Sequence, residues 1–316
     1  MLSENTKPRV SSFTIDVEDG ISIAMRDIFR TEVAQTTRVV DRTEQVLALL
    51  EKHETVGTFF ILGQVAASFP DLVKKIAASG HEVGVHGYDH WQFFKMTPTQ
   101  ARTELTRAKH LLEDLIGQTV NGHRAPAFSI IPATTWAFDV IAECGFTYDS
   151  SIIPVKGHRY GWPSFPKDIV QIHTPQGNQL VEVPVSAVRI LNREFAFSGG
   201  GYLRLFPFQF TLWAFVRELK QRPVILYIHP YELDTVRYPD YYFAAMQKAP
   251  LLTRLKMRSN WLNRDTMAPK LSALLKKHSF TTMQDLIASQ ATHLMPKWQI
   301  SGDGKASLIK SDQRKA

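Results

Sequence analysis

The feature that most constrains the fold of this chain is an alternation of short apolar runs with capped, amphipathic segments through its first half. Three apolar runs predict buried strands: residues 10–17, 57–63 and 81–86. Capping-box sequences at 41–44 and 97–100 predict helices between and after them. Strands that alternate with helices favour a parallel sheet wrapped by helices, and four such units are expected up to residue 149.

The second half keeps this pattern less regularly. Residues 152–206 are rich in proline and glycine, and we interpret them as an irregular insertion near the mouth of the fold. A helix over 207–219 and a strand over 223–229 then restore the alternation. The sequence therefore predicts one domain over 1–291 and a polar, basic tail over 292–316.

Composition excludes several classes of protein. Of 316 residues, 44% are hydrophobic and 21% charged, which excludes disordered and fibrous chains. The first residues hold no apolar leader, and no apolar run reaches the roughly 18 residues of a membrane span, so a cytoplasmic location is expected. The single cysteine, Cys144, precedes a glycine at a predicted helix end, which favours a structural thiol.

The net charge of +7 bears on possible partners. Basic residues are spread along the chain with no nucleic-acid reading motif, so we expect no nucleic-acid partner. Local enrichment at 248–264 and at the C-terminus is compatible with solvated surface, with peripheral association with an anionic membrane, or with a phosphate-bearing substrate.

Polar groups capable of chemistry fall at the ends of predicted strands. There are four such stretches: 16–19 (Asp-Val-Glu-Asp), 86–90 (His-Gly-Tyr-Asp-His), 124–126 (Arg-Ala-Pro) and 229–232 (His-Pro-Tyr-Glu). Because the carboxyl ends of parallel strands meet at one edge of a sheet, these groups are expected to converge.

Two histidines and two carboxylates suggest a metal site. His86 and His90 are four residues apart, and a helical turn after the strand would put both imidazoles on one face. Asp16 and Glu18 point the same way on a strand, so one could bind metal while the other takes a proton. Taken singly, the histidines also fit core or surface positions, and the carboxylates fit a solvated turn.

Two further groups complete the constellation. Arg124 is either an ordinary surface arginine or a guanidinium that holds a carboxylate ionised and oriented. His229 ends a very apolar strand, where it is either a satisfied core group or a general acid that protonates a leaving amine.

In this order, the four stretches resemble the polysaccharide deacetylase family with the NodB homology domain, of the carbohydrate esterase 4 type, over about residues 10–290. The resemblance implies an α/β fold, a deformed (β/α)7 barrel. Stretches 16–19, 198–202 and 229–232 are similar to the subgroup associated with bacterial exopolysaccharide and surface-glycan clusters.

The resemblance also implies roles for individual residues. Asp16 corresponds to the general base, Arg124 to the residue that orients it, and His229 to the general acid. Metal ligands correspond to His86 and His90 together with a carboxylate. Positions matching the substrate-binding groove are Pro126, Tyr148, Asp149 and Tyr202, and the stretch at 148–149 is expected to help position the acid histidine.

The sequence departs from the family pattern at two points. The family usually has two adjacent aspartates, whereas this chain has Asp16-Val-Glu18-Asp19. We favour Glu18 as the ligand because it shares a strand face with Asp16, and Asp19 is the alternative. Many members have an aromatic residue directly after the proline of the third stretch, where this chain has Ala127.

The function implied is metal-dependent hydrolysis of the acetamide of an N-acetylated sugar, in an oligosaccharide, glycan or glycan precursor, with release of acetate. One divalent ion is expected, with Zn²⁺ first and Co²⁺, Fe²⁺ or Mn²⁺ also compatible. The alternatives are a hydrolase that opens a cyclic imide or amidine on the same scaffold, and a non-catalytic glycan-binding protein.

Overall fold

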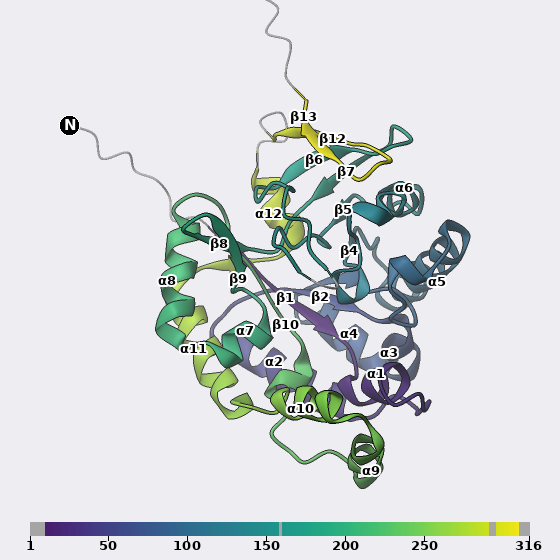
Figure 1. Ribbon diagram of the computed structural model, residues 1–316, viewed down its shortest axis with the longest axis vertical. Coiled ribbons are helices and arrows are strands. Elements are labelled where there is room, and N and C mark those ends of the chain that lie inside the picture. The colour runs from purple at the N-terminus through teal and green to yellow at the C-terminus, as the bar shows by residue number, and fades with distance from the viewer. Residues whose placement is uncertain (1–9, 158–159, 291–294, 310–316) are drawn as a thin grey trace, which may run out of the picture.

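The computed structural model describes residues 10–157, 160–290 and 295–309. One large sheet has the strand order β10-β1-β2-β3-β4-β5-β7-β6-β12-β13, with β11 paired to β1, and a separate hairpin joins β8 to β9. Helices surround the sheet (Figure 1). Within the described ranges, no helix is both long and apolar enough to cross a membrane.

The strands along the central, mostly parallel part are short. They are β1 Ser11–Val17, β2 Thr58–Ile61, β3 Glu82–Val85, β4 Gly122–His123, β5 Tyr148–Asp149, β6 Val170–His173, β7 Gln179–Glu182, β10 Ile225–Ile228, β11 Phe280–Thr281, β12 Lys297–Ile300 and β13 Ala306–Leu308. The hairpin strands are β8 Ala187–Ile190 and β9 Arg193–Ala196.

The α-helices mostly follow individual strands and pack on the outer face of the sheet. They are α1 Gly20–Asp27, α2 Arg38–Lys52, α3 Gly63–Ser68, α4 Pro70–Ala78, α5 Pro98–Ile116, α6 Trp136–Glu143, α7 Gly200–Leu205, α8 Phe208–Leu219, α9 Asp240–Lys248, α10 Leu251–Ser259, α11 Met267–Lys277 and α12 Met283–Ser289.

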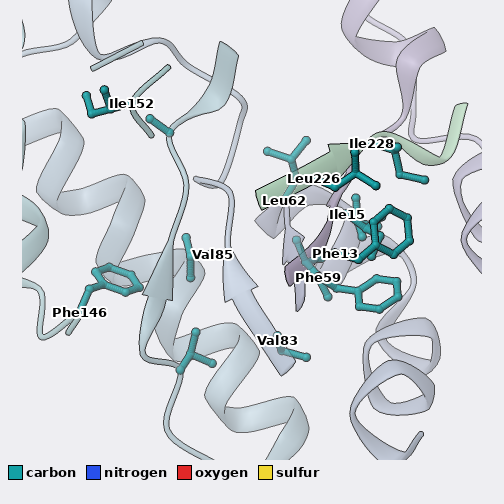
Figure 2. Packing of buried hydrophobic residues seen from close by; sticks show 14 of the residues in the cluster. Phe13, Ile15, Phe59, Leu62, Val83, Val85, Phe146, Ile152, Leu226 and Ile228 are labelled. Atoms are coloured by element: carbon teal, nitrogen blue, oxygen red, sulfur yellow. The ribbon is translucent and has the colours of Figure 1, made fainter. Parts of the chain in front are cut away.

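Strand β1 has two chemically different faces. Phe13 and Ile15 point into the apolar layer between sheet and helices, beside Leu226 of β10 (Figure 2). The intervening Thr14 and Asp16 are buried on the opposite, inner face. Because side chains alternate along a strand, this pattern places polar groups of β1 at the axis of the fold.

The sheet curves without closing into a complete ladder. The edge strand β10 meets the segments that follow β7 and β9 through single bonds: the Ser186 amide donates to the Ile225 carbonyl at 3.4 Å, and the Tyr227 amide donates to the Ser198 carbonyl at 2.9 Å. Such an open, parallel arrangement agrees with the expected α/β fold of the deformed-barrel type, although no closed barrel forms among the described residues.

Helix α12 covers the base of this sheet, at the amino ends of its strands. The Tyr148 hydroxyl donates to Glu82 Oε1 at 2.7 Å. Glu82 Oε2 accepts from the Thr58 hydroxyl at 2.7 Å and from the Gln284 amide at 3.0 Å. The base is therefore closed by satisfied polar contacts, and the mouth at the carboxyl ends is the open side.

Some helix boundaries match the sequence and others do not. The capping box of Thr97 and Gln100 is confirmed, and α5 ends at Gly117 with φ of +67°. The box expected at 41–44 is wrong, because α2 begins earlier at Arg38 and Asp41 lies in its first turn. A helix start one turn earlier leaves the same apolar face buried, so the pattern of apolar residues did not distinguish the two.

The second half is more ordered than its composition indicated. Residues 152–206 contain four strands and α7, and β7 continues the main sheet by pairing with β5. Part of the expected tail also belongs to the sheet, since β12 pairs with β6 in parallel and with β13 antiparallel. These strands have three or four residues each, and β6 and β12 pair across more than a hundred residues, so local sequence carried little signal for them. Residues 291–294 and 310–316 of the tail lie outside the described ranges.

Candidate metal centre and catalytic site

Three buried side chains converge at the mouth of the sheet. Glu18 follows β1, and His86 and His90 follow β3. Glu18 Oε2 lies 3.0 Å from His90 Nε2 and 3.5 Å from His86 Nε2. One oxygen and two nitrogens, all within 4.8 Å of one another, are the donor set that zinc and related divalent metals prefer.

The orientation of His86 leaves a lone pair for this cluster. Its Nδ1 lies 2.9 Å from the Arg124 carbonyl oxygen, which can only accept a hydrogen bond. Nδ1 therefore carries the proton, and Nε2, on the side of Glu18, is unprotonated in the neutral ring. A backbone carbonyl bound to the far nitrogen is a common way of orienting a metal-binding histidine.

The histidines come together through a loop and not through the helical turn considered from their spacing. Gly87 has φ of +76° and His90 has φ of +58°. A left-handed backbone is uncommon for histidine and marks a position held by its surroundings. A Cβ at Gly87 would lie 3.2 Å from Pro126, so this glycine lets the third stretch pack against the histidine loop.

Glu18 also fits a cation electrostatically. Its Oε2 is buried and accepts no hydrogen bond within the described chain. Burial opposes ionisation, but His90 and His229 lower the pKa of Glu18 well below its ordinary value. The same carboxylate, with Asp27, raises the pKa of His90 to about 9 against the effect of burial. A divalent cation bound here would take the place of the proton on His90 as the positive charge beside Glu18.

Asp19, the alternative ligand, is used by the local structure. Its Oδ1 accepts from the Ile21 amide at 3.0 Å, which caps α1, and its Oδ2 accepts from the Thr36 amide at 2.6 Å. With both oxygens occupied, Asp19 lies outside the cluster of Glu18, His86 and His90.

Arg124 holds Asp16 from one side only. The guanidinium is fully buried and donates to Asp16 Oδ1 at 2.8 Å and to the Thr14 hydroxyl at 2.7 Å. Its other nitrogens donate to the Ser150 carbonyl and hydroxyl, at 2.9 and 2.8 Å. Arg124 is thus a satisfied interior group, and it leaves Asp16 Oδ2 free of this contact.

His229 faces the same space from β10. Its Nε2 lies 3.9 Å from Asp16 Oδ2 and 3.7 Å from Glu18 Oε1. Burial lowers the pKa of His229, but Glu18, Glu232 and Asp16 together raise it to about 9. The imidazole is therefore protonated at neutral pH and can donate a proton at Nε2.

Glu232 is a site residue that the sequence did not single out. Its Oε2 lies 3.5 Å from His229 Nδ1 and accepts from the His229 amide at 3.0 Å. A Cβ at Gly200 would lie 1.7 Å from Glu232 Oε2, so the glycine run at 199–201 permits this carboxylate to approach. The signal was present as a histidine followed three residues later by glutamate, which also fits a helix cap.

Asp27 and Trp91 were also missed. Asp27 Oδ2, on α1, lies 3.9 Å from His90 Nδ1. Trp91 directly follows His90, is 42% exposed, and lies under the Arg26 guanidinium at 5.5 Å. Helix α1 was not predicted, so no sequence pattern brought its residues to the mouth.

Two of the residues assigned to the groove by resemblance lie elsewhere. Tyr148 is buried against Phe60 and directs its hydroxyl to Glu82 at the base. Asp149 is buried and accepts from His123 Nδ1 and the Ser151 hydroxyl, both at 2.7 Å. Neither offers a surface to a ligand, and Glu232 occupies the place beside His229 that was expected for the 148–149 stretch.

Pro126 and Tyr202 lie closer to the mouth. The Tyr202 hydroxyl is 2.9 Å from that of Tyr160, which contacts Phe128 with ring centroids 6.4 Å apart. Phe128 in turn lies 5.6 Å from the Arg124 guanidinium. These rings form an aromatic wall on the α7 side of the site, which is continued by Tyr227, 4.8 Å from Phe128.

The chain is similar to known proteins in both sequence and fold. Residues 6–148 match the model of the polysaccharide deacetylase family, and residues 150–288 match a domain of unknown function, DUF3473. A peptidoglycan-N-acetylglucosamine deacetylase of Bacillus cereus is 28% identical over 150 residues, which are 44% of this chain and 53% of that protein. A peptidoglycan deacetylase of Helicobacter pylori is 32% identical over 136 residues, 43% of each chain.

The chain thus spans about half the length of these relatives. A crystal structure of a Mycobacterium smegmatis protein described as a polysaccharide deacetylase aligns with 94% of this chain and 95% of its own, with 21% identity and a TM-score of 0.60. That likeness extends to the second half of the chain and concerns the fold.

Proposed function

We propose, from the premise that residues 6–148 are a domain of the polysaccharide deacetylase family, that the protein is a metal-dependent hydrolase of the acetamide of an N-acetylated sugar. The observation that carries the proposal is a cluster of five side chains at the mouth of the sheet. Glu18, His86 and His90 lie together, Asp16 beside them is hydrogen-bonded to Arg124, and His229, whose pKa is raised, faces the same space. A ligand set, a base and an acid are then within reach of one bound amide.

The ligand set is Glu18, His86 and His90, and Zn²⁺ is the metal we propose for it. A bound divalent ion supplies Lewis acidity, which polarises the amide carbonyl and makes water more acidic. Asp16 accepts the proton of the attacking water at Oδ2, because Arg124 occupies Oδ1 and orients the carboxylate.

His229 acts at the opposite stage of the reaction. Its Nε2 faces the cluster and can transfer a proton to the departing nitrogen, and the neighbouring Glu232 and Asp16 carboxylates favour the protonated ring. Glu232, close to Nδ1, orients the ring and stabilises its positive charge. The products are acetate and a free amine on the sugar.

The substrate side of the proposal is supported by the exposed ring of Trp91 and by the half-buried Tyr160 and Tyr202 of the aromatic wall, since aromatic faces suit pyranose sugars. The two relatives are described as acting on peptidoglycan or its N-acetylglucosamine. For this chain we propose an N-acetylhexosamine in a glycan or glycan precursor, with exopolysaccharide biosynthesis as the setting. The cytoplasmic location stays a prediction.

The test is acetate release from N-acetylglucosamine oligosaccharides and from nucleotide- and lipid-linked N-acetylated sugars by the metal-loaded protein. We expect metal-dependent release that disappears in Asp16→Asn and His86→Ala and persists in Cys144→Ser, a change outside the site. Turnover of cyclic imides or amidines without acetate release would favour the alternative hydrolase. Glycan binding with no turnover of any of these compounds would favour a binding protein.

A further inference from the structure

A cavity lined by arginines and by apolar side chains lies away from the catalytic cluster, between α9 and α10. It has a volume of about 420 Å³ and is lined by Arg237, Arg254 and Arg258 together with Phe243, Met246 and Trp261. Arg237 pairs with Asp240 at 2.7 Å. Neither Arg254 nor Arg258 pairs with a carboxylate or donates a side-chain hydrogen bond among the residues that the structure describes. The cavity is suited to an anion.

The surface around this cavity is both basic and apolar. Residues 241–264 include five basic residues and no acidic one. Four leucines there are largely exposed: Leu251 at 65%, Leu252 at 81%, Leu255 at 52% and Leu262 at 55%. Exposed leucines clustered beside unpaired arginines are the combination found in helices that lie in the surface of an anionic membrane.

Helix α10 has the matching arrangement. With 3.6 residues per turn, Leu251, Leu252 and Leu255 fall within about 100° of arc. Arg254 and Arg258 lie on one side of this stripe, and Met257 faces the interior, where it joins the cluster of α1 and α9. The leucines can therefore enter the acyl boundary while the arginines remain at the level of phosphates.

The residues around the cavity contact the segments at the mouth of the site. Trp261 packs on Tyr238, with ring centroids 4.3 Å apart, and on the Arg264 guanidinium at 4.4 Å. Arg264 also donates to the Asp234 carbonyl at 3.1 Å. Helix α1, which directly follows Glu18 and Asp19, packs against α9 and α10 (Figure 1).

We propose that residues 236–262 form a membrane-docking surface, in which the four leucines enter an anionic phospholipid bilayer and the arginine-lined cavity receives lipid phosphate. If the proposed deacetylase function holds, docking places the mouth of the site near the headgroups, where a lipid-linked glycan is accessible. The docking itself is independent of catalysis and is measured without substrate.

The experiment is co-sedimentation of the full chain with phosphatidylcholine vesicles, with and without about a third of phosphatidylglycerol. We expect binding only to the anionic vesicles, and steep weakening by salt, because exposed charges are screened. The double changes Leu252→Glu with Leu255→Glu, and Arg254→Glu with Arg258→Glu, should each weaken binding about tenfold or more.

Matched controls are two double changes on the β8–β9 hairpin: Leu191→Glu with Phe195→Glu, and Arg189→Glu with Arg193→Glu. The proposal is overturned if the wild type does not prefer anionic vesicles, or if the controls weaken binding as much as the α10 changes. It is also overturned if the leucine changes leave binding intact while millimolar inorganic phosphate displaces the protein, because a soluble anion site would then account for the binding. Sedimentation velocity that reveals a lipid-free dimer broken by the leucine changes would assign the surface to a second copy.

Discussion

The half-buried Glu82 and the buried Glu18 lie at opposite ends of the same sheet, and they differ in what surrounds them. Glu82, at the base, receives hydrogen bonds from Tyr148, Thr58 and the Gln284 amide. Glu18, at the mouth, has an oxygen that accepts no hydrogen bond in the described chain and faces two imidazole nitrogens. Burial raises the pKa of Glu82, whereas the neighbouring histidines lower that of Glu18.

The difference separates structural from functional burial. A buried carboxylate that has its donors stabilises the fold, and removing it leaves those donors unpaired. A buried carboxylate that lacks them costs free energy unless a ligand supplies the missing partner. Burial of a carboxylate alone therefore does not identify a metal site. A buried carboxylate oxygen that has no hydrogen-bond donor and faces imidazole nitrogens does.

The largest effect is expected at the mouth. Asp16→Asn keeps the shape of the side chain but removes the base, so the deacetylation rate should fall about 10²–10⁴-fold. Metal content should be unchanged, because Asp16 is not in the ligand cluster. The rate is measured as kcat/KM by acetate release, with Glu82→Gln as the comparison variant at the base. Equal losses in both variants would remove the distinction between mouth and base.

The pH dependence of stability should distinguish the two ends. In the metal-free protein the pKa of His229 is raised from 6.5 to about 9, and that of His90 likewise. The contribution of these two histidines to the free energy of unfolding is fully present below pH about 6.5 and is lost as the pH rises through about 9. Thermal unfolding in EDTA should show a falling Tm over that range, with a smaller fall in His229→Gln. A profile unchanged by that substitution would contradict the assignment.

Substitution of Glu82, at the base of the sheet, should change the stability of the protein and not its metal content. Glu82→Gln replaces one acceptor by an amide nitrogen facing donors, which should lower the free energy of unfolding by about 1–3 kcal/mol. Metal stoichiometry should be unaffected. Denaturant titration and metal analysis on the same preparation test both halves of this expectation. Loss of metal in Glu82→Gln would mean that the two ends are coupled.

The smallest effect is expected for Asp19, the neighbour of Glu18. Asp19→Ala removes the cap of α1 and should cost about 0.5–2 kcal/mol in stability. Because both Asp19 oxygens accept hydrogen bonds from backbone amides, we expect the variant to retain the metal. Chemical unfolding gives the first value and metal analysis the second. A variant of normal stability that binds no metal would make Asp19 the ligand instead.

Strand ends were the most predictable part of the site. His86 and His229 each follow a short apolar run, so the parallel-sheet pattern alone predicted that they converge. Sequence could not tell which way a long interior side chain points, and Tyr148 directs its hydroxyl to the base. Nor could it distinguish Glu18 from Asp19, since the capping role of Asp19 depends on helix α1, which local patterns did not indicate.

The second half was harder for a different reason. Strands such as β6 and β12 pair across more than a hundred residues, and their stability comes from those partners more than from their own composition. Helix α10 exposes Leu251, Leu252 and Leu255 where a core pattern would bury them. Apolar residues that contact an outside partner do not follow the spacing that turns a helix face toward the protein's own core. A search for core-facing helix patterns therefore does not find them.

The most direct test of the metal site is the zinc stoichiometry and affinity of the metal-stripped protein, measured by calorimetry for the wild type, Glu18→Gln and Asp19→Asn. We predict one equivalent bound tightly by the wild type and by Asp19→Asn, and at least a tenfold loss of affinity in Glu18→Gln. Tight binding that survives in Glu18→Gln, or is lost only in Asp19→Asn, would contradict the account.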